Sequence, residues 1–236
     1  MGFATSTDST HAYMRAGDLD VAFQGGGYVD SLLAKLDAFT ARADAQWTSK
    51  TIVQEELKSL LPDVCLKAEA GNDNPIANFL SMQGVSFNRL AMDIDTSPQE
   101  GINGETLICG MHTDSLMIDS IRLDLKHGDD GLDFLTEVIS NTRKNQEAFE
   151  INLDGHIGNG QAQLLLQYLN AKKEKGVYIG VNAALGRRGI RMRFFPENPT
   201  LVYRPFQLNE RNYLYLWIMH HTAMTAHMFL RFQADR

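Results

Sequence analysis

The spacing of apolar residues changes near residue 71, and this change separates two kinds of predicted structure. Before it, apolar side chains recur at the spacing of an amphipathic helix. The first stretch carries Leu32, Leu33, Leu36 and Phe39, and the second carries Leu57, Leu60 and Leu61. Thr48 or Ser49 would cap the second stretch and Pro62 would end it. We therefore predict a pair of helices within residues 27–70, packed against the rest of the chain.

After the turn-rich sequence GNDNP, residues 71–75, the pattern becomes one of short segments with alternating or β-branched apolar residues. Examples are VSFNRLAMDID, SLMIDSIRLDL and AFEINLDGHI. Alternation of this kind is typical of strands with one buried face. Two segments, residues 130–147 and 159–175, are predicted to be helical insertions, and Asn159 is predicted to cap the second of them.

These elements predict an α+β protein with a jelly-roll-like core, a double-stranded β-helix, over residues 71–236. Residues 27–70 would be the helical pair, and residues 1–26 a flexible N-terminal arm with one short strand at DLDVAF. The alternative is a three-layer α/β fold, because strands and helices are predicted to alternate in the middle of the chain. Residues 209–232 fit either one long helix or two strands.

Charge and cysteine content narrow the classes of partner. The formal net charge is -7 and no basic stripe is present, which argues against nucleic acid as a partner. Two cysteines, Cys65 and Cys109, are too few for a disulfide scaffold, so a reducing compartment is expected: the cytoplasm, or a host cytoplasm into which the protein is delivered. No apolar run is long enough for a transmembrane segment. Gly2 and Ser6 fit the pattern for N-myristoylation, which would give a weak lipid anchor.

A candidate metal site starts from His112 and Asp114 in the sequence GMHTDSLMID. Two residues apart on a strand, these side chains would point to the same face. An imidazole and a carboxylate on one face, with a second histidine, make a set that binds non-haem Fe(II) and leaves coordination positions open. His220 is the preferred third ligand, and His221 and His156 are the others considered.

The HTD triplet resembles the HxD motif of the Fe(II)/2-oxoglutarate-dependent oxygenases. That resemblance implies a double-stranded β-helix, with iron held by His112, Asp114 and His220, and oxidation of a small molecule or a protein side chain. It also implies an arginine that pairs with the cosubstrate carboxylate. Arg231, 11 residues after His220, is one candidate, and Arg188 in RRGIRMRFFPENPTLVYRP is the other. No histidine precedes Arg188 at the distance that the second alignment requires.

Two other classes of function remain open. One is a non-enzymatic interaction protein, such as a secreted effector or a viral structural component, which fits the polar, Ser/Thr-rich start of the chain. The other is a hydrolase or acyltransferase in which Cys65 is the nucleophile, with His112 or His156 as base and Asp154 as the orienting group. Arg191 and Arg193 would share one face of a strand, where they could bind a carboxylate or a phosphate.

Overall fold

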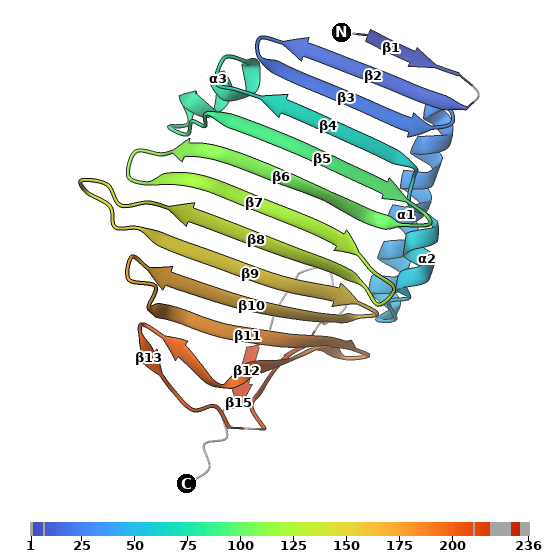
Figure 1. Ribbon diagram of the computed structural model, residues 1–236. Helices are drawn as coiled ribbons and strands as arrows, with labels where there is room; N and C mark the ends of the chain where they lie inside the picture. Colours follow the sequence, from blue (N-terminus) through green and yellow to red (C-terminus); the bar gives the residue numbers. More distant parts are fainter. Residues whose placement is uncertain (1, 7, 210, 218–227, 232–236) are drawn as a thin grey trace.

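The computed structural model describes residues 2–6, 8–209, 211–217 and 228–231. Their strands form one antiparallel sheet, in which nearly every strand pairs with the strands that precede and follow it in the sequence (Figure 1). The first strands are β1 (Gly2–Thr5), β2 (Ser9–Ala16), β3 (Leu19–Gly26), β4 (Val64–Ala70), β5 (Arg89–Ser97), β6 (Gly101–His112) and β7 (Met117–His127). They continue with β8 (Leu132–Ser140), β9 (Phe149–Gly158), β10 (Gln161–Asn170), β11 (Lys175–Gly186), β12 (Gly189–Leu201), β13 (Arg204–Pro205), β14 (Tyr213–Trp217) and β15 (Met228–Arg231).

Cross-strand register places apolar residues in continuous rows on one side of the sheet. One row of directly paired residues contains Leu90, Ile108, Ile121, Val138, Ile151 and Tyr168. The next contains Met92, Thr106, Leu123, Thr136, Leu153 and Leu166, and a third contains Ile94, Gly104, Leu125, Phe134, Gly155 and Leu164. Because side chains alternate between the two faces of a sheet, all three rows lie on the same face. We call this the apolar face.

The intervening residues give the opposite face a mainly polar and charged surface, with Leu107, Leu135 and Leu165 interspersed. Lys67 pairs with Asp93 across β4 and β5 at 2.8 Å, and Arg122 pairs with Asp124 on β7 at 2.9 Å. These ion pairs are exposed, as expected for a face in contact with water. The sheet is therefore amphipathic along its whole described middle part.

Two helices cross the ends of the strands (Figure 1). Helix α1 (Val29–Ser49) follows β3, and α2 (Gln54–Ser59) leads back to β4, which pairs with β3. A 21-residue helix is about 31 Å long, close to the roughly 29 Å that separates β3 from β9 at about 4.8 Å per strand. At the β3 end, Leu32 packs against Gly25, where a Cβ would lie 2.5 Å from the Leu32 Cδ1. Beyond the other end of α1, Ile52 lies beside Gly160 in the β9–β10 turn.

The third helix, α3 (Pro75–Met82), covers a corner of the same face at the opposite ends of the strands. Asn74 caps it, because its side-chain oxygen accepts from the Ala77 N–H at 2.9 Å, and Pro75 supplies a favourable first residue. Below α3 lies a small, well-buried cluster formed by Leu19, Ala70, Ala77 and Phe87, with Val21, Leu80, Leu90 and Ile108 at its margin.

The prediction of a β-rich protein with N-terminal helices is confirmed, but several details are wrong. The strands follow sequence order in one sheet, whereas a jelly roll folds its strands into two sheets by Greek-key connections. The pairing is antiparallel throughout, which excludes the three-layer α/β alternative. The arm predicted over residues 1–26 forms three strands rather than one.

Both predicted helical insertions are also strands. Residues 130–147 contain β8, and residues 159–175 contain β10, so Asn159 lies in the β9–β10 turn and caps no helix. In the C-terminal segment, the described residues form the antiparallel pair β14 and β15, which excludes a continuous helix over residues 209–232.

Candidate functional site

The predicted iron ligands do not lie on one strand. β6 ends at His112, whose backbone pairs with Ser86. Asp114 lies in the following turn, which is closed by the Thr113 N–H donating to the Leu116 carbonyl at 2.8 Å. Both side chains are exposed. Among the described residues, neither belongs to a cluster of three metal-binding side chains.

Of the other predicted site residues, Arg188 and Arg231 lie near the C-terminal end of the sheet. His220 and His221 lie outside the described residues. Arg188 is exposed in the turn between β11 and β12, and Arg231 ends β15, with its backbone opposite Tyr213. An iron site built on His112, Asp114 and His220, with 2-oxoglutarate at Arg231 or Arg188, therefore stays a prediction.

The residues of the proposed cysteine hydrolase are far apart. Cys65 lies on β4, whereas His156 and Asp154 lie on β9, five strands away or roughly 24 Å. His156 is bound to Asp133 at 2.7 Å. A hydrogen bond with Asp95 raises the pKa of the Cys65 thiol, which disfavours the nucleophilic thiolate. The structure thus brings none of the predicted histidines to Cys65.

Cys65, Asp93 and Asp95 do form a compact group, with ligand atoms within 4.8 Å of one another. However, Lys67 Nζ already donates to Asp93 Oδ2 at 2.8 Å, so a cation occupies part of this group. The group lies on the charged face of the sheet, at the surface.

The strongest candidate for a functional surface is the apolar face itself. From β5 to β10 the three rows extend over six strands, about 24 Å, and together with the next row toward α2 they extend about 20 Å along the strands. None of the three rows contains a charged side chain. Exposed apolar patches larger than a few hundred Å² are typical of interaction sites in proteins. This area is therefore large enough to require an explanation.

Most of this area is incompletely covered. Among the described residues, the buried apolar side chains other than proline are Leu19, Leu32, Leu61, Ala70, Ala77 and Phe87. All of these lie on the helices, beside them, or on the strands under α3. In contrast, no residue of the three rows is buried, and Leu164 and Leu166 keep 36% of their surface exposed. The helices thus cover two margins of the apolar face and leave its centre open.

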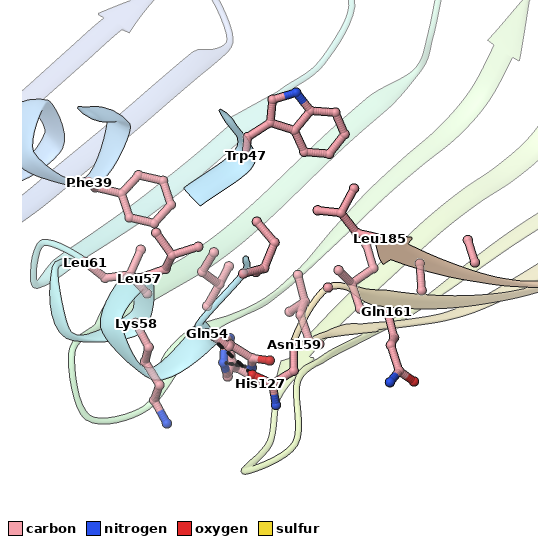
Figure 2. A pocket seen from close by; sticks show the side chains of 18 of the residues that line it. Phe39, Trp47, Gln54, Leu57, Lys58, Leu61, His127, Asn159, Gln161 and Leu185 are labelled. Atoms are coloured by element: carbon pink, nitrogen blue, oxygen red, sulfur yellow. Dashed lines mark hydrogen bonds between the residues drawn. The ribbon is translucent and has the colours of Figure 1, made fainter. Parts of the chain in front are cut away.

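At the margin under α1 and α2, the apolar face becomes a cavity of about 460 Å³. Its floor continues the rows of the apolar face as Ile102, His127, Leu132, Ile157, Ala162 and Ala183. Figure 2 shows Phe39, Trp47, Leu57, Leu61 and Leu185 around the apolar part of the cavity. Cavities of about 300–1,000 Å³ hold small molecules in proteins.

One side of the cavity is polar, and its central pair is already hydrogen-bonded. The buried Gln54 side chain accepts from His127 Nε2 at 2.8 Å when its amide is oriented to match donors with acceptors. In that orientation it also donates to the Asp130 carbonyl and accepts from the Gly131 N–H, each at 3.2 Å. Burial and the charge of Lys58 lower the pKa of His127, so the ring is neutral at pH 7.

Two further polar groups at the cavity have fewer hydrogen-bond or ion-pair partners. Lys58 lines the cavity, and its ammonium has no carboxylate partner within the part of the chain that the structure describes. The Asn159 side-chain oxygen accepts from the Gln54 N–H at 3.4 Å, and its amide N–H group donates to no described residue. In Figure 2 the ends of Lys58 and Asn159 lie on one side of the cavity and the rings of Phe39 and Trp47 on the other.

Comparisons with known proteins find no matching family model, no matching curated protein and no matching solved structure. The assignment of a function therefore depends on the geometry of the site. Within the described parts of the chain, no helix is both long enough and apolar enough to cross a membrane.

The three rows of the apolar face contain no charged residue, cysteine or histidine, so no catalytic motif in the sequence points to them. The signal was present as alternation: Ala162, Leu164, Leu166 and Tyr168 follow at every second position of β10. What the alternation could not indicate is that no second layer covers these residues.

Proposed function

We propose that the apolar face binds the acyl chains of lipids. The observation that carries this proposal is a continuous apolar surface, six strands wide, whose centre no described element covers. Burying apolar surface gains about 25 cal/mol per Å². A hydrocarbon ligand on this face would therefore be bound without any directed polar contact.

The chemistry of the face favours acyl chains over a protein partner. Its rows consist mainly of Leu, Ile, Val and Met with interspersed Thr and Gly; Phe134 and Tyr168 are their two aromatic residues, and no arginine or tryptophan belongs to them. Protein interfaces, in contrast, depend on aromatic and arginine anchors. The four rows extend about 20 Å along the strands, and the acyl chains of one membrane leaflet extend about 15 Å, half of a roughly 30 Å hydrocarbon core.

The test is a lipid-capture experiment. The protein is mixed with phosphatidylcholine vesicles that contain a phospholipid with a fluorescent acyl chain. The vesicles are then removed by flotation, and the lipid that stays with the protein is measured. We expect the protein to retain lipid, and Leu166→Asp to retain several-fold less, because a carboxylate in the second row opposes hydrocarbon binding.

The matched control is Gln167→Glu, the next residue on β10, which adds the same charge to the opposite face. It should retain lipid as the unaltered protein does. If the unaltered protein retains no lipid, the proposal is wrong. It is also wrong if sedimentation shows a dimer that Leu166→Asp dissociates, because the face then binds a second copy of the chain.

A further inference from the structure

The cavity under α1 and α2 differs from the open centre of the apolar face in two ways. It is enclosed by helices on one side, and it has a polar rim. Its volume of about 460 Å³ is near the lower end of the range for small-molecule sites. These properties restrict the ligand more than the open face does.

His127 Nε2 and the Gln54 amide are not available to a ligand, whereas His127 Nδ1 is buried without a partner among the described residues. His127 Nε2 is bound to Gln54, and the ring lies directly on Gly101, where a Cβ would come within 2.3 Å of His127 Cγ. Both ends of the Gln54 amide also bind the Asp130–Gly131 backbone. This pair therefore fixes α2 to the β7–β8 turn and has a structural role.

The Lys58 ammonium and the amides of Asn159 and Gln161 are the donors that remain at the rim. A lysine that lines an apolar cavity packs its methylene groups on apolar surface and keeps its charge at the edge. An anion beside Lys58 would accept a hydrogen bond from its ammonium, and such a bond is strong because the donor is charged. Glu55 is the acidic residue that acts on the same imidazole as Lys58, and its side chain is exposed.

We propose that this cavity binds one acyl chain that carries an anionic headgroup, with the chain between Trp47 and Leu185 and the anion at Lys58. The proposal extends the proposed function, because the cavity floor is a continuation of the apolar face. A fatty-acid carboxylate and a lysophospholipid phosphate present the same chemistry to Lys58, and the experiment separates them.

The test uses fluorescence of Trp47, which lines the cavity. The chain has two tryptophans, so Trp217→Phe leaves Trp47 as the only emitter. Bromine on an acyl chain quenches a tryptophan that it contacts. We expect quenching by a brominated fatty acid or by a brominated lysophosphatidic acid, and the stronger of the two identifies the headgroup.

Lys58→Gln should weaken binding of the brominated acid about tenfold, in line with the loss of a charge-assisted hydrogen bond. Lys58→Arg should restore it. The control Lys35→Gln removes a charge from an exposed part of α1 that does not line the cavity, and should change nothing. A brominated alcohol, which has no charge, should bind equally to the Lys58→Gln variant and to the unaltered protein.

A second variant, Ala183→Phe, fills the cavity floor and should abolish quenching while lipid capture by the open face continues. If the unaltered protein captures lipid but Trp47 is not quenched, the cavity proposal is wrong and the proposed function stands. Quenching that persists when capture is absent would overturn the proposed function alone. Equal loss of acid and alcohol binding in Lys58→Gln would show that Lys58 does not recognise the anion.

Discussion

The corner of the apolar face under α3 and its open centre have the same sequence pattern but different environments. Under α3, Leu19, Ala70 and Phe87 have 3–5% of their surface exposed. In the open centre, Leu164 and Leu166 have 36% exposed. Leu19 and Ala70 in the corner, like Leu164 and Leu166 in the centre, lie on paired strands. The comparison teaches that alternation fixes which way a side chain points, whereas a covering helix decides whether that side chain stabilises the fold.

From this comparison, we expect the largest loss of unfolding free energy when a core residue under α3 is truncated. Phe87→Ala should lower the free energy of unfolding by about 3–5 kcal/mol, the usual cost of removing a buried aromatic ring. Leu166→Ala, in the open centre, should cost less than about 1 kcal/mol, because solvent already reaches the side chain. Urea unfolding followed by circular dichroism measures both. Equal losses would mean that the centre is covered in solution.

A smaller loss of unfolding free energy is expected when α3, the helix that covers the corner, is destabilised. Asn74 caps α3, and its side-chain N–H group also donates to Asp18 Oδ1 at 2.7 Å and to the Gly71 carbonyl at 3.0 Å. Asn74→Ala should therefore cost about 2 kcal/mol of unfolding free energy. Asn74→Ser keeps an oxygen that can cap the helix and should cost less. Indistinguishable unfolding curves for Ala and Ser would exclude a capping role.

The free energy of unfolding should depend on pH through His127, at the margin under α2. Burial, together with the charge of Lys58, lowers the pKa of His127 from 6.5, while Glu55 opposes this shift. Below pH 6.5 His127 therefore binds a proton more readily in the unfolded chain than in the folded chain. Stability from this site is complete above pH 6.5 and decreases as the pH falls toward the lower folded pKa.

The urea midpoint should thus decrease between pH 7 and pH 5.5. His127→Gln should show a smaller decrease over the same interval, because no titrating group remains at that position. Parallel pH profiles for the two proteins would assign the decrease to other groups.

The smallest effect should come from the contact between α1 and α2. Arg42 pairs with Glu56, and both side chains are almost half exposed. Arg42→Ala should change the unfolding free energy by less than about 1 kcal/mol, and the change should shrink at high salt. Gln46 still donates to Glu56 at 2.8 Å in that variant. A loss larger than that at Asn74 would show that this pair holds the helices in place.

The sequence predicts the strands well where β-branched residues alternate, as in residues 117–127 and 149–158. It misleads where composition favours another element. QAQLLLQYLN in β10 is rich in residues of high helix propensity, but pairing with β9 and β11 on both sides overrides that preference. The turn before it contains Asn159 and Gly160, both with positive φ, which is the strongest local signal for a hairpin.

The candidate site is less predictable than the fold for a physical reason. A catalytic motif can be recognised within a short stretch of sequence, whereas the apolar face is formed by side chains from many strands that are far apart in the sequence. Each strand supplies only a few side chains, such as Leu153 on β9 and Leu166 on β10. The cavity requires, in addition, that α1 reach from β3 to β9, which depends on helix length and on the close approach at Gly25. Neither condition is visible in local spacing.

The route of the chain between β3 and β4 has a consequence for protein engineering. The chain leaves the ladder at Gly26 and rejoins it at Asp63, and these two residues are joined by a backbone hydrogen bond of 2.8 Å. The intervening α-hairpin is therefore an insertion between neighbouring strands, and a short tight turn could bridge the same gap. Such a shortened protein would keep its strand order while losing the roof of the cavity, so ligand enclosure could be added or deleted as a separate module.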